Sequence, residues 1–163
     1  MLVAALVAVT AQIAEPTIVA ELPQPVSGQI ASAITDCKSA LRDGGMESLA
    51  TGGWKPAKLK KSSLLDGDIK GLMTKGSDSP LVEFKRARNG LTTCTLWGRA
   101  DKRQDLPSLI STIANALPSK SAEKIMAAYL FAGEDVVAAM NPHDSYNGPV
   151  FNIGIFPVKR GKK

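Results

Sequence analysis

The sequence contains few aromatic residues, one histidine and two cysteines, and this scarcity excludes several classes of site. Phe, Trp and Tyr make up 5% of the 163 residues, too few for the stacking rows of single-strand nucleic-acid binders. His143 is the only histidine, which excludes HExxH sites and multi-histidine zinc sites. P-loop, dinucleotide-binding and GxSxG motifs are also missing. We therefore expect no metal and no cofactor.

The sequence also lacks an apolar run of the ~20 residues that a membrane-spanning helix needs. Its one long apolar stretch, residues 1–14, is uncharged and meets Glu15 and Pro16. This pattern is typical of the apolar core and cleavage zone of a secretory signal peptide. We expect cleavage after Ala11 or, as the alternative, after Ala14. No Lys or Arg precedes the run, and the competing interpretation is an apolar first element of the mature fold.

The expected export of the protein decides how the two cysteines are interpreted. Cys37 and Cys94 form an even pair, and an even count in an oxidising compartment favours pairing. We expect one disulfide between them, with two buried free thiols as the alternative. The spacing is not CxxC, which disfavours a thioredoxin-type redox site. The processed protein is expected in the periplasm or outside the cell, and not as an integral membrane protein.

Length and composition predict one domain of ordinary size. Hydrophobic residues make up 44% of the chain and charged residues 21%, as in a typical globular protein. After the signal peptide we expect an extended, Pro-rich segment over 15–26, a single domain over 27–158 and a basic tail over 159–163.

Two segments have the apolar periodicity of amphipathic helices. The first covers 28–42, with Ser27 as its N-cap and Gly44 and Gly45 as its end. The second covers 105–117 and has Pro107 in its first turn.

The clearest strand signal is a hairpin of residues 81–88 and 91–99 around Asn89 and Gly90. Asn-Gly favours a two-residue type I′ turn, which would pair Arg86 with Thr93 and Phe84 with Thr95. Further strands are expected over 124–132, 136–140 and 150–158, with a helix over 122–132 as a competitor. The expected fold is α+β, with two helices on one face of a mainly antiparallel sheet of about five strands.

The net charge of +5 is concentrated in clusters, and a basic balance favours anionic partners. We interpret these clusters first as an ordinary solvated surface, with an anion-binding surface formed by two of them as the alternative. The expected partner is an acidic protein, a lipid or a cell-envelope polymer, and nucleic acid is not expected. The residues of this surface are Lys55, Lys58, Lys60, Lys61, Lys85, Arg86 and Arg88.

His143 lies in the most polar loop of the sequence, residues 141–149. Together with Asp144 it is the one catalytic candidate, although adjacency in sequence does not make a catalytic triad. We predict a non-enzymatic exported binding module that uses the open face of the sheet or this loop. The alternatives are a small exported hydrolase that uses His143 with Asp144, and a cytosolic nucleic-acid binder.

Overall fold

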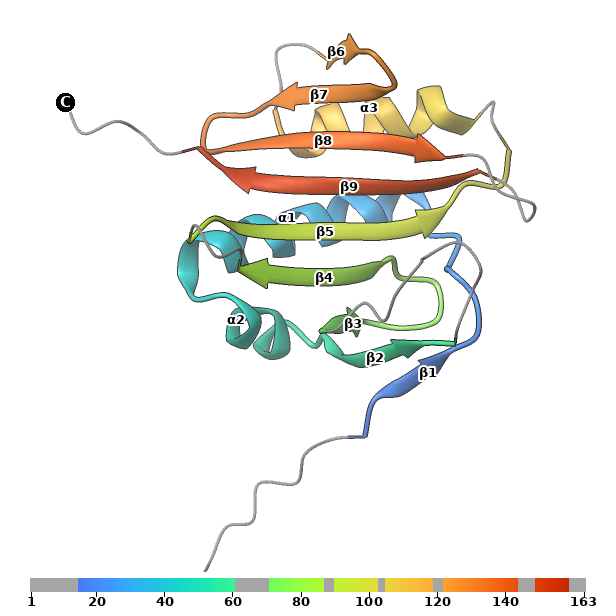
Figure 1. Cartoon of the computed structure of the whole chain (residues 1–163), viewed down its shortest axis with the longest axis vertical. Coiled ribbons are helices and arrows are strands. Elements are labelled where there is room, and N and C mark those ends of the chain that lie inside the picture. The colour runs from blue at the N-terminus through green and yellow to red at the C-terminus, as the bar shows by residue number, and fades with distance from the viewer. Residues whose placement is uncertain are drawn as a thin grey trace, which may run out of the picture.

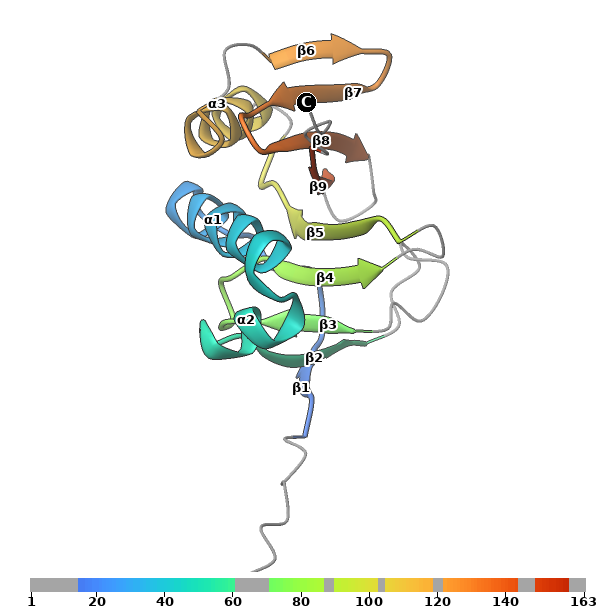
Figure 2. The same cartoon turned by 90° about the vertical axis from the view of Figure 1, so that its left-hand side faces the viewer.

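The computed structural model describes residues 15–60, 71–86, 90–102, 105–118, 122–143 and 149–158. These residues form one nine-stranded mixed sheet with three helices on one of its faces (Figures 1 and 2). The predicted signal peptide over 1–14 and the predicted basic tail over 159–163 lie outside the described residues. None of the described helices is long and apolar enough to cross a membrane.

After one short strand, the chain passes twice from helix into a group of four strands. The elements in order are β1 (Thr17–Val19), α1 (Ser27–Asp43), α2 (Met46–Thr51), β2 (Lys55–Leu59), β3 (Leu72–Thr74), β4 (Leu81–Arg86), β5 (Thr92–Arg99), α3 (Leu106–Ala116), β6 (Ala122–Ile125), β7 (Ala128–Ala132), β8 (Val136–His143) and β9 (Val150–Pro157). The spatial order is β1-β2-β3-β4-β5-β9-β8-β7-β6. The β1–β2 pair is parallel and the other pairs are antiparallel.

The predicted fold of two helices on about five antiparallel strands is wrong. The described residues contain three helices and nine strands, and one strand pair is parallel. The short strands β1, β2 and β3 carry little of the alternation that identifies a strand from sequence. The single strand expected over 124–132 is instead two strands, because the chain reverses at Met126 and Ala127.

Helix α1 forms where the sequence predicts it, but its first residue is Ser27 and its N-cap is Val26. The Ser27 cap is therefore a wrong prediction. The backbone N–H of Val26 donates to the side-chain Oε1 of Gln29 at 2.8 Å, so the glutamine provides the capping contact. At the other end Gly44 and Gly45 have φ of +128° and +79°, a conformation that ends helices and favours glycine.

A disulfide joins Cys37 of α1 to Cys94 of β5, which confirms the predicted pairing. The two Cα atoms are 5.7 Å apart, and both side chains are fully buried. The bridge therefore fixes the central helix to the middle of the sheet.

The β4–β5 hairpin exists, but its predicted register is wrong by one residue. Phe84 pairs with Cys94 and Arg86 pairs with Thr92. A one-residue shift moves every side chain to the other face relative to its partner strand. The observed register places Phe84 and Cys94 on the same side, toward the helices. Burial of the apolar set therefore decides the register, and Asn89 itself lies outside the described residues.

The main core lies between the sheet and the helices. It contains large, fully buried side chains that include Leu96, Ile113, Phe131, Phe151 and Ile153. Helices α1 and α3 also contact each other above the sheet.

A smaller apolar cluster lies on the other side of the sheet, near β1. It consists of Leu22, Leu72, Leu81 and Val150. Leu22 belongs to the segment before α1, which is anchored by a 2.8 Å hydrogen bond from the backbone N–H of Arg99 to the carbonyl oxygen of Pro23. The described N-terminal segment, residues 15–26, therefore covers this part of the second face.

Candidate functional site

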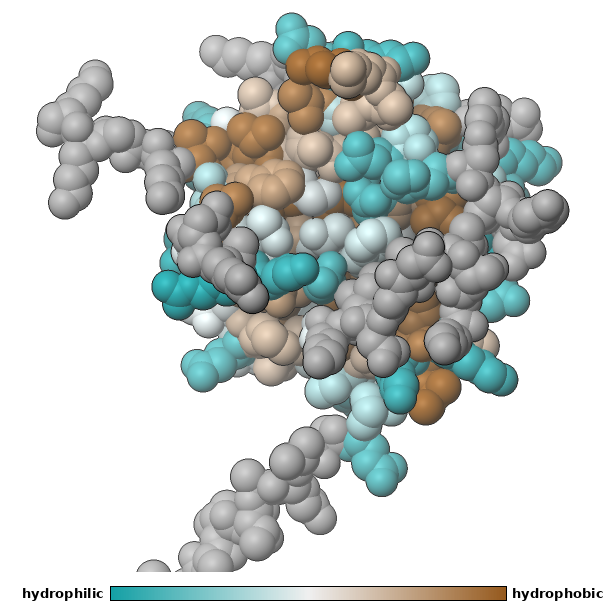
Figure 3. Space-filling model, in the orientation of Figure 1, coloured by the Kyte–Doolittle hydropathy of each residue, from teal (hydrophilic) through white to brown (hydrophobic). Residues whose placement is uncertain are grey.

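The face of the sheet that carries no helix is the candidate functional site. Figure 2 shows the helices on one side only, and Figure 3 looks onto the opposite side. Because side chains alternate along a strand, each residue between two core residues points to this open face. Small side chains occupy its middle, where Thr95 and Ala139 both pair with Gly154. Pale side chains of intermediate hydropathy lie across the middle in Figure 3, with a hydrophilic group beside them.

Three polar side chains on this face are linked by hydrogen bonds. Asn141 and Asn152 pair directly between β8 and β9. Asn141 Nδ2 donates to Asn152 Oδ1 at 3.1 Å, and Asn152 Nδ2 lies 3.2 Å from His143 Nε2. An amide nitrogen can only donate, so this contact is a hydrogen bond in the imidazole tautomer in which Nε2 accepts and Nδ1 carries the proton. We call these three residues the amide ladder.

The amide ladder has hydrogen-bonding groups at both of its ends. In that tautomer His143 Nδ1–H is a donor, and Asn141 Oδ1 is an acceptor that receives no hydrogen bond from the described residues. His143 is exposed, and both asparagines are half-buried. A ligand that offers a donor to Asn141 and an acceptor to His143 matches this arrangement.

The surroundings of the amide ladder include two aromatic side chains. Trp97 of β5 pairs directly with Asn152, and its buried Nε1 has no hydrogen-bond partner in the part of the chain that the structure describes. The ring of Phe156 lies over Gly154, since a Cβ at that glycine would be 3.0 Å from the ring. The open face thus combines amide groups with partly exposed aromatic surface.

The predicted catalytic candidate His143 is the last residue of β8 and not a loop residue. Its described partner is the amide of Asn152 and not a carboxylate. Asp144 lies outside the described residues. The signal that the sequence analysis missed is the cross-strand alignment of Asn152 with Asn141, because this depends on the β8–β9 register.

Of the predicted anion-binding residues, Lys55 and Lys58 lie on β2, and Lys60 directly follows this strand. Lys85 and Arg86 lie on β4, which β3 separates from β2. Lys55, Lys58, Lys60, Lys85 and Arg86 are all exposed. Alternation places Lys85 on the open face and Arg86 on the helix side. Similarly, Lys55 and Lys58 point to opposite faces, because they lie three residues apart on one strand.

The other members of that surface, Lys61 and Arg88, lie outside the described residues. The anion-binding surface stays a prediction, and its described members divide between the two faces.

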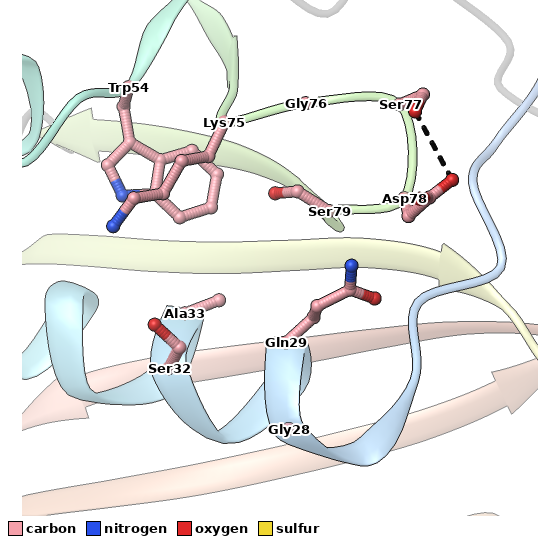
Figure 4. Close-up of a pocket in the computed structure, with 10 residues that line it drawn as sticks. All are labelled: Gly28, Gln29, Ser32, Ala33, Trp54, Lys75, Gly76, Ser77, Asp78 and Ser79. Atoms are coloured by element: carbon pink, nitrogen blue, oxygen red, sulfur yellow. Dashed lines mark hydrogen bonds between the residues drawn. The ribbon is translucent and has the colours of Figure 1, made fainter.

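A pocket of about 310 Å³ lies beside the start of α1 (Figure 4). Trp54 and Lys75 lie side by side on one wall, and Gln29 points across the pocket toward Ser79. Trp54 Nε1 donates to Asp36 Oδ2 at 2.9 Å, and Lys75 Nζ lies 3.1 Å from the same oxygen. These contacts fix α1 to the strands beside it.

Two serines of this pocket also have partners within the chain. Ser77 Oγ donates to Asp78 Oδ1, and Ser79 Oγ donates to the carbonyl oxygen of Pro80. Because several of its polar groups already have partners within the chain, the pocket is a weaker candidate than the open face.

The described residues contain no group of three or more His, Cys, Asp or Glu side chains that could hold a metal ion. No protein family, curated protein or solved structure matches this chain. The open face is therefore interpreted from its own geometry.

Proposed function

We propose that this protein is an exported, non-enzymatic binding domain that acts in the periplasm or outside the cell. Two features support export. The Cys37–Cys94 disulfide is a bond that persists in oxidising compartments. The apolar, uncharged start of the sequence has the form of a signal peptide.

The amide ladder is the observation that carries the binding function. Side-chain amides donate and accept at once, so they complement hydroxyl and amide groups better than they complement a single charge. No cation belongs to the ladder, which disfavours an acidic partner at this position. Of the three predicted partner classes, the open face supports a cell-envelope polymer.

We infer that the polymer is an N-acetylated glycan. Each N-acetyl group presents one N–H and one carbonyl oxygen, which fit the acceptor at Asn141 and the donor at His143. The apolar face of a sugar ring can also lie against partly exposed aromatic rings such as Phe156.

The hydrolase alternative gains no comparable support. A general base needs to be oriented by a third group and placed next to a nucleophile or water. The described partner of His143 is an amide, which orients the ring but does not stabilise an imidazolium as a carboxylate would.

The test is isothermal titration calorimetry of the protein with the soluble tetramer of N-acetylglucosamine. We expect saturable binding that weakens about ten-fold in Asn152→Ala, because this change removes both hydrogen bonds of the ladder. Asn115→Ala is the matched control, since Asn115 is an exposed asparagine on α3. An absence of binding, or an equal loss in both variants, would refute the proposed ligand and site.

A further inference from the structure

The hairpin of β6 and β7 ends in a turn that exposes large apolar side chains. Ile125 pairs with Ala128, which leaves Met126 and Ala127 as a two-residue turn. Met126 is 93% exposed and Ile125 is 48% exposed. Apolar (brown) side chains gather over this end of the sheet at the top of Figure 3. Covering such side chains is favourable, so this turn is suited to contact an apolar environment outside the chain.

The backbone conformation of Met126 gives a second, independent observation. Its φ is +55°, in the left-handed region where a bulky residue is unusual. Glycine is the usual residue at the first position of a two-residue hairpin turn with this conformation. Neither the backbone nor the packing of this chain therefore explains a methionine at this position.

The residues that flank the turn have the chemistry of a membrane interface. Lys124 precedes the apolar pair and Tyr129 follows the turn, and Lys124 Nζ lies 5.8 Å from the centre of the Tyr129 ring. Lys and Tyr place an apolar body near hydrocarbon and a polar end among lipid head groups. The segment from Lys124 to Tyr129 contains no acidic residue.

We propose that this turn, residues 124–129, docks onto an anionic phospholipid surface. Met126 and Ile125 enter the boundary between head groups and acyl chains, and Lys124 contacts lipid phosphates. This inference goes beyond the proposed glycan function and uses different residues. Figure 1 places β6 at the opposite end of the sheet from β1, so docking at β6 leaves the open face uncovered.

A second copy of the chain fits this edge less well than a lipid surface does. In a two-fold symmetric, antiparallel pair of β6 strands, odd-numbered residues of one copy face odd-numbered residues of the other, and even-numbered residues face even-numbered ones. Two registers pair most residues of β6 with the second copy. In one of them Glu123 faces Glu123 of the other copy, and in the other Lys124 faces Lys124. Like charges directly opposite each other destabilise a strand pair.

The experiment is co-sedimentation of the full chain with vesicles of equimolar phosphatidylglycerol and phosphatidylcholine. The test variant is Met126→Asn, because asparagine tolerates positive φ and removes the apolar side chain. We expect its vesicle binding to fall at least about ten-fold, with an unchanged or higher melting temperature. Lys124→Gln should weaken binding by about five-fold and only for anionic vesicles.

The matched control is Ile18→Thr, which removes another exposed apolar side chain, 68% exposed, on β1 at the far end of the sheet. It should bind vesicles as the unaltered protein does. The proposal is overturned if the unaltered protein does not bind anionic vesicles. Equal binding by the Met126 variant, or an equal loss in the Ile18 variant, would also overturn it.

Discussion

The two faces of the central strands carry opposite kinds of side chain at adjacent positions. On β9, Ile153 and Ile155 are fully buried against the helices, while Asn152 before them and Phe156 after them remain partly exposed. Antiparallel sheets often bury one face and leave the other in water. In this protein the face without helices has a hydrogen-bonded ladder of its own. The helix side therefore provides the stability of the fold, and we assign binding to the open side.

The largest expected effect on the helix side is removal of the disulfide. Cys37→Ala combined with Cys94→Ala should lower the free energy of unfolding by about 4 kcal/mol, because the bridge closes a long loop with a sequence separation of 57. Urea denaturation of the oxidised protein and of the double variant measures this difference. A loss below about 1 kcal/mol would mean that packing alone holds α1 on β5.

Neighbouring residues of β9 provide the most direct contrast between the faces. Ile153→Ala should cost about 3 kcal/mol of unfolding free energy, because it leaves a cavity in the core. Asn152→Ala should cost about 1 kcal/mol or less, since its bonds are partly exposed to water. Equal losses in urea denaturation would contradict this division between the faces.

Two glycines sharpen the comparison, because each lies under a phenylalanine ring on a different face. A Cβ at Gly98 would be 2.6 Å from the buried ring of Phe151, and one at Gly154 would be 3.0 Å from the ring of Phe156. We expect Gly98→Ala to destabilise the protein by about 2 kcal/mol through overpacking.

Gly154→Ala should cost less, because Phe156 is partly exposed and can move. Melting temperatures of the two variants provide the measurement. If Gly154→Ala is the more damaging change, the open face is packed as tightly as the core.

The smallest expected effect concerns an ion pair on the outer surface of α1. The adjacent guanidinium of Arg42 lowers the pKa of Asp43 through a hydrogen bond, and the carboxylate in turn raises the pKa of Arg42. Because the pKa of Asp43 is lowered by folding, its contribution is present above the unfolded pKa and disappears as the pH falls through the folded pKa. Asp43→Asn should therefore remove a slight pH dependence of the folding stability at acidic pH.

Thermal unfolding between neutral and acidic pH tests this expectation. A large loss at neutral pH would contradict it, since exposed pairs contribute little to stability.

Local signals in the sequence predict only part of this structure. The periodicity of α1 and the even cysteine count are local, and both predictions are confirmed. The Asn-Gly signal at residues 89 and 90 predicts a hairpin correctly, but burial of Phe84 and Cys94 on one side sets a different register. Strands such as β3 contain three residues, and contacts with residues distant in the sequence stabilise them.

The candidate site depends on tertiary structure even more than the helices and strands do. His143 is conspicuous in the sequence as the only histidine. Asn152, however, lies within a strand of mainly apolar residues and becomes significant only through its pairing with Asn141. A cross-strand ladder has no sequence spacing that identifies it, because loop lengths and register determine which residues meet.

The most direct test of the central claim is an NMR titration of the side-chain amide groups. The ¹⁵N-labelled protein is titrated with the tetramer of N-acetylglucosamine while the signals of Asn141, Asn152 and Asn115 are followed. We expect saturable shifts for the two open-face asparagines and none for Asn115 on α3. If neither Asn141 nor Asn152 shifts, or if Asn115 shifts with them, the open face is not the binding site.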